Sequence, residues 1–521
     1  MDGIRLNHLR NQRLYTLAFF LLAFAAAYVV AGWIIADAAE NLLWAGLALA
    51  AGAIFLSILN NWRSGFYFFL IWLLFEDLVR KYMGNNMAIY FGKDVLVGIC
   101  YVSFFVALRR GQAQTFRPRF FLPLMFFFWL GFLQVFNPYS PSMLCGFLGL
   151  KLYFYYAPLM FVGYALVDSE PGLHKFLMFN LKLAVVIALL GGIQAIRGPE
   201  FLNPVDLAPD IRALSTLNRV APLSGQVVYR PTSVFVSDGR FGWYLILMWL
   251  VAFGAAGYLL LKTRRSRNLA FLSFGVITAA IPMTGSRGAL LWTAGSALIT
   301  AAAFVWGAPW KQREAYRIVR AIQRAFLVGG LAVLCLLIFY PQAIGARFSF
   351  YSETLNPSSP ASELQYRTGE YPFHNLMLAF QHERWPYGYG IGTASLGRQY
   401  ISRIMKVAPL PIGVENGFGT LIIEFGILGL ALWLAWTAAL LLAEWRVVYK
   451  LRGTPYFPIA FSIFWFSFLL LLPFTYMGMA PYQNFILNAY LWLLVGVLFR
   501  LPALAGFTLP YQVTPTPARA R

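Results

Sequence analysis

Long apolar stretches that alternate with short polar turns make up most of this chain. Because a membrane-spanning helix needs roughly 20 consecutive apolar residues, the pattern predicts about 14 spans. They are expected near residues 14–36, 41–59, 65–79, 90–108, 119–136, 142–166, 174–196, 241–261, 268–284, 288–307, 326–342, 416–443, 455–474 and 482–500. The sequence therefore predicts an all-α fold, a polytopic transmembrane helix bundle.

The composition agrees with a membrane protein and excludes a soluble globule. The 521 residues are 60% hydrophobic and 12% charged, whereas about a quarter of the residues of soluble domains are charged. The formal net charge of +21 lies mostly in short loops between the apolar stretches, where membrane topology explains it better than nucleic acid binding does. The three cysteines fall within apolar stretches. No disulfide framework, metal site or cofactor is therefore expected.

The distribution of lysine and arginine predicts the orientation of the spans. Two basic loops, 262–267 and 311–324, flank a pair of spans joined by the turn 284–288. Cytoplasmic loops concentrate these residues, so both loops are predicted to be cytoplasmic and the turn to face outward. Alternation along the chain then places both termini in the cytoplasm. Arg287 lies in the outward turn, where topology does not account for it.

The spans and loops divide the chain into six predicted regions. These are N-terminal transmembrane helices (1–196), an outer loop (197–240), transmembrane helices with the outward turn (241–342), a large outer loop (343–414), C-terminal transmembrane helices (415–500) and a cytoplasmic tail (501–521). The large loop contains aromatic and apolar residues at helical spacing, so one or two short helices over the membrane domain are expected. The end of the tail, 511–521, is expected to be disordered.

Three segments occur in a fixed order in the second half of the chain. They read TGSRGA at 284–289, WPYGYGIG at 385–392, and ENGF at 415–418 followed by EFGILGL at 424–430. With RPTS at 230–233 upstream, they resemble the C-terminal domain of the O-antigen ligase and polymerase superfamily, the Wzy/WaaL-like integral membrane glycosyltransferases. The resemblance covers about residues 270–440. It implies metal-independent glycosyl transfer from undecaprenyl-pyrophosphate-linked glycans at the periplasmic face of the inner membrane.

Arginine suits that chemistry because its planar guanidinium pairs bidentately with phosphate oxygens and keeps its charge. Arg287, Arg230 and Arg367 are the candidate ligands of the pyrophosphate, with Ser286 beside them. A turn arginine can instead reach lipid headgroups, and long translocated loops escape the charge rule. The remaining arginines of the outer segments are expected to be surface charges that together attract anionic lipids: Arg212, Arg219, Arg240, Arg347, Arg384 and Arg398.

A general base is expected near the start of the span after the large loop. Ligases that the chain resembles carry a His-Asn pair there, whereas this chain has Glu415 and Asn416. Glu415 is the candidate base and Asn416 a candidate substrate contact. The alternative for Glu415 is stabilisation of a helix N-terminus. His374 and His382 are rival bases.

Other polar residues fall within apolar stretches or a glycine-rich loop. Glu424 and Lys151 lie at membrane depth, where a substrate contact and a structural ion pair are equally expected. Lys93 and Asp94 are expected to neutralise each other. The glycines of the 385–392 segment follow no predicted strand, which disfavours a nucleotide-binding loop. They are expected to turn the backbone tightly beneath the active site: Gly388, Gly390 and Gly392.

The resulting hypothesis is an inverting glycosyltransferase that polymerises undecaprenyl-pyrophosphate-linked oligosaccharides, an O-antigen or exopolysaccharide polymerase of the Wzy type. The missing histidine favours this over an O-antigen ligase. A transporter or flippase of lipid-linked glycans is the competing class, but transporters place their polar groups at the midplane in broken helices. The expected partners are the lipid-linked glycan and the bilayer. A chain-length regulator or an export complex is a further candidate, and nucleic acid is not expected.

Overall fold

A computed structural model describes residues 52–58, 60–118, 120–262, 266–309, 338–395 and 413–507 of the chain. Within these ranges the protein is a helical bundle with a single two-stranded hairpin. Eight of the described helices are long and apolar enough to cross a membrane. The predicted all-α membrane fold is therefore confirmed. The number of about 14 spans stays a prediction, because the stretch 14–36 and most of 41–59 and 326–342 fall outside the described residues.

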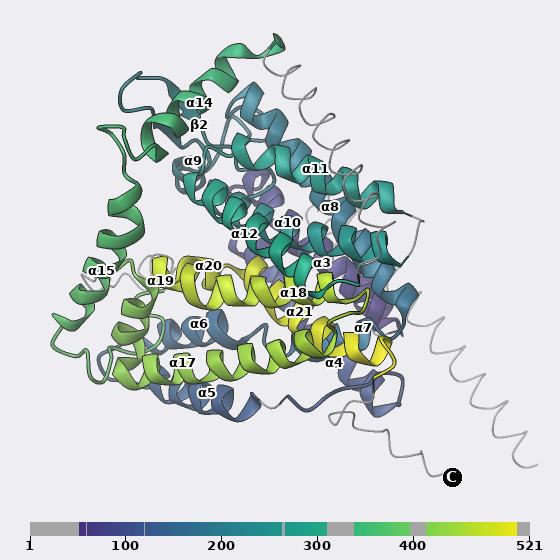
Figure 1. Cartoon of the computed structure of the whole chain (residues 1–521). Helices are drawn as coiled ribbons and strands as arrows, with labels where there is room; N and C mark the ends of the chain where they lie inside the picture. The colour runs from purple at the N-terminus through teal and green to yellow at the C-terminus, as the bar shows by residue number, and fades with distance from the viewer. Residues whose placement is uncertain are drawn as a thin grey trace, which may run out of the picture.

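The elements follow one another through the chain as shown in Figure 1. They are α3 (Trp62–Tyr82), α4 (Met87–Arg109), α5 (Phe121–Val135), α6 (Met143–Phe154), α7 (Leu159–Leu166), α8 (Glu170–Arg197), α9 (Pro209–Ser215), β1 (Asn218–Val220), β2 (Val227–Tyr229), α10 (Asp238–Leu261), α11 (Arg267–Met283), α12 (Arg287–Gly307), α14 (Pro341–Leu355), η1 (Tyr366–Glu370), α15 (Tyr371–Phe380), α17 (Gly417–Lys450), α18 (Phe457–Leu469), η2 (Leu470–Phe474), α19 (Thr475–Met477), α20 (Ala480–Gln483) and α21 (Phe485–Leu504).

Helices α21 and α10 form the centre of the bundle. In the apolar 18-residue stretch of each helix, 100% of the residues of α21 and 83% of those of α10 are buried. Helix α7 packs closely on α21 because glycines let the two backbones approach. A Cβ on Gly496 would lie 1.9 Å from the Met160 carbonyl oxygen, and one on Gly163 would lie 2.1 Å from the Leu493 carbonyl oxygen. Close backbone approach at small residues is a common basis of helix association in membranes.

Helix α17 is broken near its start, at Gly426 (φ 75°, ψ −174°). Buried backbone groups need partners at membrane depth, and the 385–392 segment supplies them. The amides of Tyr389 and Gly390 donate to the carbonyls of Ile423 (2.7 Å) and Glu424 (3.2 Å). The Ile427 amide donates to Pro386 O at 3.3 Å. The glycine-rich segment therefore completes the hydrogen bonding of the broken helix.

A buried charge network joins α3, α4, α6 and α10. Lys93 pairs with Glu76 at 3.1 Å, and Lys151 pairs with Asp94 at 2.5 Å. The prediction that Lys93 and Asp94 neutralise each other was therefore wrong. Neighbours in sequence project from a helix in different directions, so each finds its counter-charge on another helix. The network satisfies charges whose isolated burial would be costly.

Turns that were predicted to lie on one side of the membrane meet at one end of the bundle. Lys81, at the end of α3, donates to Thr232 Oγ1 (2.8 Å) and to the Ser233 carbonyl (3.0 Å), in the segment that precedes α10. In Figure 1, α14, α9 and β2 lie together at the top, and α15 lies at the left edge. The predicted short helices of the large outer loop are present as α14 and α15.

We expect Gly426→Ala to destabilise the protein by roughly 3 kcal/mol, because the φ and ψ at this position are accessible almost only to glycine. A Cβ there would also lie 2.3 Å from the Pro386 carbonyl oxygen. The thermal unfolding midpoint in detergent measures the effect. Gly192→Ala in α8 is the matched control, because a Cβ at Gly192 meets nothing within 4 Å. An unchanged midpoint in Gly426→Ala would contradict the account of the helix break.

Candidate functional site

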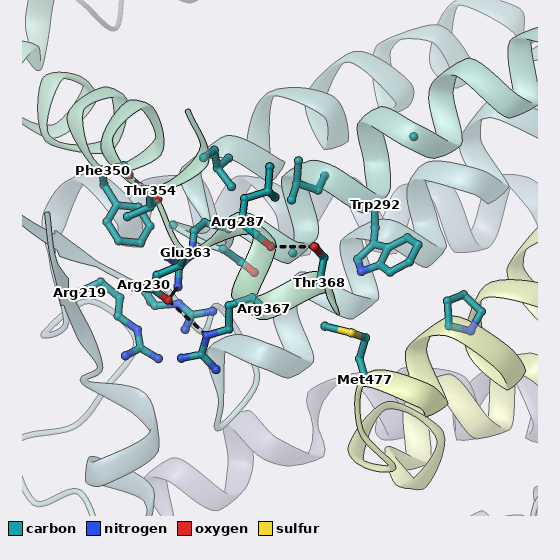
Figure 2. A pocket seen from close by; sticks show the side chains of 18 of the residues that line it. Arg219, Arg230, Arg287, Trp292, Phe350, Thr354, Glu363, Arg367, Thr368 and Met477 are labelled. Carbon is teal, nitrogen blue, oxygen red and sulfur yellow. Dashed lines mark hydrogen bonds and ion pairs between the residues drawn. The ribbon is translucent and has the colours of Figure 1, made fainter. Parts of the chain in front are cut away.

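A cavity of about 580 Å³ lies where the start of α12 meets the β1–β2 hairpin, α14, the η1 segment and the region of η2 and α19. Four arginines that are distant in sequence line it: Arg219, Arg230, Arg287 and Arg367. Figure 2 shows these cationic side chains on one side of the cavity and Trp292 with Met477 on the other. The structure therefore brings the three predicted pyrophosphate ligands, with Ser286, into one site.

Arg287 reaches the cavity because of the tight turn between α11 and α12. Helix α11 contains Pro282 near its end, and Gly285 follows with φ 64°. A Cβ on Gly285 would lie 3.1 Å from the Val228 side chain, so glycine allows the turn to lie against β2. Ser286 then caps α12 by accepting a hydrogen bond from the Ala289 amide at 3.3 Å. Its hydroxyl stabilises the helix start and places Arg287 at the first helical position.

Arg230 follows β2 directly and is held from both sides. Its guanidinium pairs with Asp238 at 2.6 Å, in the first turn of α10. The chain beyond it is fixed by Gln194, whose Oε1 accepts from the amides of Thr232 (2.9 Å) and Ser233 (2.7 Å). Ser233 has φ 52°, which is uncommon for a residue other than glycine. Several hydrogen bonds therefore hold this backbone and the arginine that precedes it.

Glu363 bridges Arg287 and Arg367. Its Oε2 atom accepts from Arg287 at 3.0 Å and from Arg367 at 3.3 Å. The hydrogen bond from Arg287, with the charges of both arginines, lowers the pKa of Glu363 below its ordinary value of 4.5. The carboxylate is therefore charged at neutral pH. Both ion pairs are lost only when the pH falls through this lowered value.

The cavity carries more positive than negative charge. Within the described part of the chain, four guanidinium groups face two carboxylates, Glu363 on the lining and Asp238 behind Arg230, which leaves two positive charges without a carboxylate partner. Two buried donors, Arg287 NH1 and Arg230 Nε, have no hydrogen-bond partner among the described residues. Buried donors are almost always paired in proteins. The site therefore has the charge and the free donors to take an anionic group.

An apolar cavity of about 460 Å³ adjoins the arginine cavity. The two share lining residues Trp292, Gly295, Pro473 and Tyr476. The second cavity extends between α12, α17 and α18, where its walls include Phe418, Leu434, Trp465, Phe468 and Leu472. A cationic compartment thus lies directly beside an apolar one. This combination suits an amphipathic ligand with an anionic head and a hydrocarbon chain.

Glu415 does not line the arginine cavity, but a short chain of contacts joins it to Arg367. Glu415 is exposed, just before α17, and its Oε2 accepts a hydrogen bond from the Tyr371 hydroxyl. That hydrogen bond raises the pKa of Tyr371. The Arg367 guanidinium lies over the Tyr371 ring, 5.1 Å from its centroid. Tyr371 therefore connects the candidate base to the cation cluster, a role that sequence reasoning missed.

The other predicted polar residues around Glu415 have different surroundings. Asn416 is buried as the cap of α17: it accepts from the Gly419 amide at 3.0 Å and donates to the Pro372 carbonyl at 2.9 Å. His374 is exposed on α15. His382 is half-buried, with its ring 6.1 Å from that of Tyr389. None of these three side chains lines the arginine cavity.

The two ionisable residues at membrane depth make structural contacts away from the cavity. Lys151 forms the ion pair with Asp94. Glu424 Oε1 accepts from the Ala394 amide at 2.9 Å and from Ser395 Oγ at 2.6 Å, and so holds the segment that follows the glycines. The three glycines turn the backbone as predicted, with φ values of 82°, 104° and 90°. They pack against α5, α6 and the break in α17, and do not line the arginine cavity.

Three arginines predicted to be surface charges have other roles. Arg240 pairs with buried Asp77 at 2.5 Å. Arg219, on β1, lines the cavity. Arg347, on α14, is only 5% exposed and donates to the carbonyls of Met283 (3.1 Å), Ala343 (2.8 Å), Ala195 (3.0 Å) and Tyr229 (3.1 Å). No sequence signal marks a cation whose partners are backbone carbonyls, three of them in distant segments.

Of the other three arginines in this group, two have positions that agree with the predicted surface charges. Arg212 is exposed on α9, and the Arg384 guanidinium lies over the Tyr139 ring. Arg398 falls outside the described residues. Glu363 was missed too, although an acid four residues before Arg367 is a recognisable helical ion-pair spacing.

Comparisons with known proteins add no assignment. No protein-family model matches this chain, and no curated protein matches it in sequence. The resemblance carried by the three motifs therefore stays a hypothesis, and the geometry of the site carries the functional argument.

We expect Arg347→Met to lower the free energy of unfolding by at least about 3 kcal/mol, since each buried carbonyl left without a donor costs roughly 1–3 kcal/mol. Arg347→Lys should be intermediate, because an ammonium makes fewer directed bonds. Thermal unfolding in detergent tests both. Arg212→Met is the control, because Arg212 is exposed and donates to one carbonyl, that of Val205. Equal midpoints for Arg347→Met and the wild type would refute the anchoring role.

Proposed function

We propose that this protein is an integral membrane glycosyltransferase whose donor is a glycan linked to a lipid through a diphosphate. Within that class we propose a polymerase of lipid-diphosphate-linked oligosaccharides, of the Wzy type. One observation carries the proposal: four arginines line a cavity that adjoins an apolar cavity between membrane helices. Two of them, Arg230 and Arg287, are half-buried and have buried donors without a hydrogen-bond partner among the described residues. This arrangement fits a diphosphate head and a polyprenyl chain.

The arginines would act on the leaving group. In the proposed reaction an acceptor hydroxyl oxygen attacks the anomeric carbon of the donor glycan. The bond between that carbon and the diphosphate oxygen breaks, and its electron pair leaves with the lipid diphosphate. Arg287, Arg230 and Arg367 stabilise the negative charge that develops on it. Fixed charges in a site with little water stabilise such a transition state strongly. Displacement in line with the breaking bond inverts the anomeric configuration.

The acceptor proton needs a base beside the arginine cluster. Glu415 is the candidate, because its carboxylate is linked through Tyr371 to Arg367. Glu415 takes the proton directly or through the Tyr371 hydroxyl, which would pass its own proton to Glu415 as it accepts one. Among the described residues, no such contact links His374 or His382 to the cluster. His374 is exposed on α15, and the ring of His382 lies beside that of Tyr389.

The side of the membrane follows from the distribution of basic residues. The arginine cavity lies at the end of the bundle that carries the turn between α11 and α12. The opposite ends of these helices lead into the basic loops 262–267 and 311–324. Because cytoplasmic loops are enriched in lysine and arginine, the cavity would face the periplasm of a bacterial inner membrane. That is the side on which a translocated lipid-linked glycan becomes accessible.

Arg287→Ala and Arg230→Ala should each reduce chain extension by about 100-fold or more, as losses of charge-stabilising donors commonly do. The assay supplies purified protein with a synthetic undecaprenyl-pyrophosphate oligosaccharide and measures longer glycans and released carrier. Arg212→Ala, which removes an exposed arginine outside the cavity, is the control. Transport of the lipid across a vesicle bilayer without extension would refute the enzyme and favour a flippase. Transfer only to a lipid A core acceptor would indicate a ligase.

Glu415→Gln should abolish extension while membrane insertion and the melting temperature are preserved, since the carboxylate is exposed. Tyr371→Phe should reduce the rate by roughly 10- to 100-fold, the range expected for impaired proton transfer. The paired variants His374→Ala and His382→Ala should retain activity. Near-normal extension by Glu415→Gln, with loss in either histidine variant, would move the base to that histidine.

A further inference from the structure

Glu363 is the only acidic side chain among the described residues that line the arginine cavity. A single carboxylate oxygen, Oε2, accepts from the guanidinium of Arg287 and from that of Arg367. One oxygen shared by two guanidinium groups is also the contact that a non-bridging phosphate oxygen makes. The carboxylate therefore lies at a position suited to part of the proposed ligand. Figure 2 shows Glu363 among the labelled arginines.

Glu363 satisfies these arginines only in part. Arg287 NH1 is buried and has no hydrogen-bond partner among the described residues, although Arg287 NH2 is bonded to Glu363. A guanidinium can engage an oxyanion through two parallel donors, and Glu363 uses one donor of each arginine. A diphosphate carries more oxygens and at least two negative charges. It would engage the unpaired donor and, with Glu363 displaced, would meet three guanidinium charges, because among the described ion pairs only Asp238 would still compensate one of the four.

The backbone at Glu363 allows its side chain to leave. The side chain is 40% exposed, so the released carboxylate is readily hydrated. Glu363 lies between the turn and bend residues 357–361 and the helical segment that leads into η1, so movement of its side chain does not require unwinding a helix. The π-helical turn η1, which carries Arg367, follows at once. Such turns occur frequently at functional sites.

We propose that Glu363 is an exchangeable counter-ion that occupies the diphosphate position in the free protein and is displaced from Arg287 and Arg367 when the ligand binds. The proposal rests on the proposed function, because it takes the ligand to be a lipid diphosphate. It assigns Glu363 a role in ligand selection. To displace the Glu363 carboxylate, a ligand must present more negative charge or more acceptor oxygens to Arg287 and Arg367 than that carboxylate does. Ion pairs at partly exposed positions are weak enough for such exchange.

The test compares the binding of farnesyl diphosphate to the full-length protein in lipid nanodiscs by isothermal titration calorimetry. Glu363→Gln removes the competing charge and should bind the probe roughly five- to tenfold more tightly than the wild type, the range given by losing one or two partly exposed ion pairs. Glu363→Asp retains the charge on a shorter side chain and should be intermediate. Glu370→Gln is the matched control: it removes the same charge from an exposed position in η1 outside the cavity.

The outcomes separate this proposal from the proposed function. Tighter binding by Glu363→Gln that disappears in the double variant Arg287→Ala/Glu363→Gln, with Glu370→Gln like the wild type, supports exchange. Equal or weaker binding by Glu363→Gln, while the wild type binds, overturns exchange and leaves the diphosphate site standing. Absence of binding by the wild type and every variant overturns the diphosphate site itself. If Glu363→Gln fails to fold, the Glu363→Asp result decides: affinity equal to or below that of the wild type overturns exchange.

Discussion

The guanidinium of Arg347 holds together the backbone segments that carry the arginine cavity. It donates to carbonyls near the ends of α8 and α11 and to the last residue of β2. Helix C-termini leave carbonyls unpaired and carry partial negative charge, so a buried cation is stabilised there without a carboxylate. The residue after Tyr229 is Arg230, and the turn after Met283 leads to Arg287. Arg347 thus fixes the backbone from which the side chains of Arg230 and Arg287 project.

The cavity concentrates like charges that would repel one another in isolation. Three of the four are compensated by carboxylates of other elements: Asp238 of α10 holds Arg230, and Glu363 before η1 holds Arg287 and Arg367. The compensation is incomplete, and the four guanidinium groups line a cavity. The charge network of α3, α4, α6 and α10 lies instead between packed helices. The network serves to position backbone, as Lys81 does for the Thr232 and Ser233 segment. The cavity keeps charge and donors available for a ligand.

The two compartments of the site suit different parts of the proposed lipid-linked substrate, its anionic head and its hydrocarbon chain. Arginines supply the charge at the end of the bundle, and aromatic and aliphatic side chains of α12, α17 and α18 line the adjoining apolar cavity. An anionic head alone would not account for the apolar compartment, and a simple lipid contact would not account for four arginines. The proposed donor requires both. This pairing is the reason to prefer a lipid diphosphate over a soluble anion.

The sequence by itself determined the membrane fold and most of the cation cluster. Apolar runs of helical length predict spans, and Arg287 stood out because it lies where the distribution of basic residues leaves no topological reason for it. Both signals are local in the chain. The tertiary structure alone decided the partners: Lys93 with Glu76, Arg347 with carbonyls, Arg367 with Glu363 and Tyr371, and Glu415 with Tyr371. Which charge meets which depends on the helices that become neighbours, and that choice is set by packing across the whole bundle.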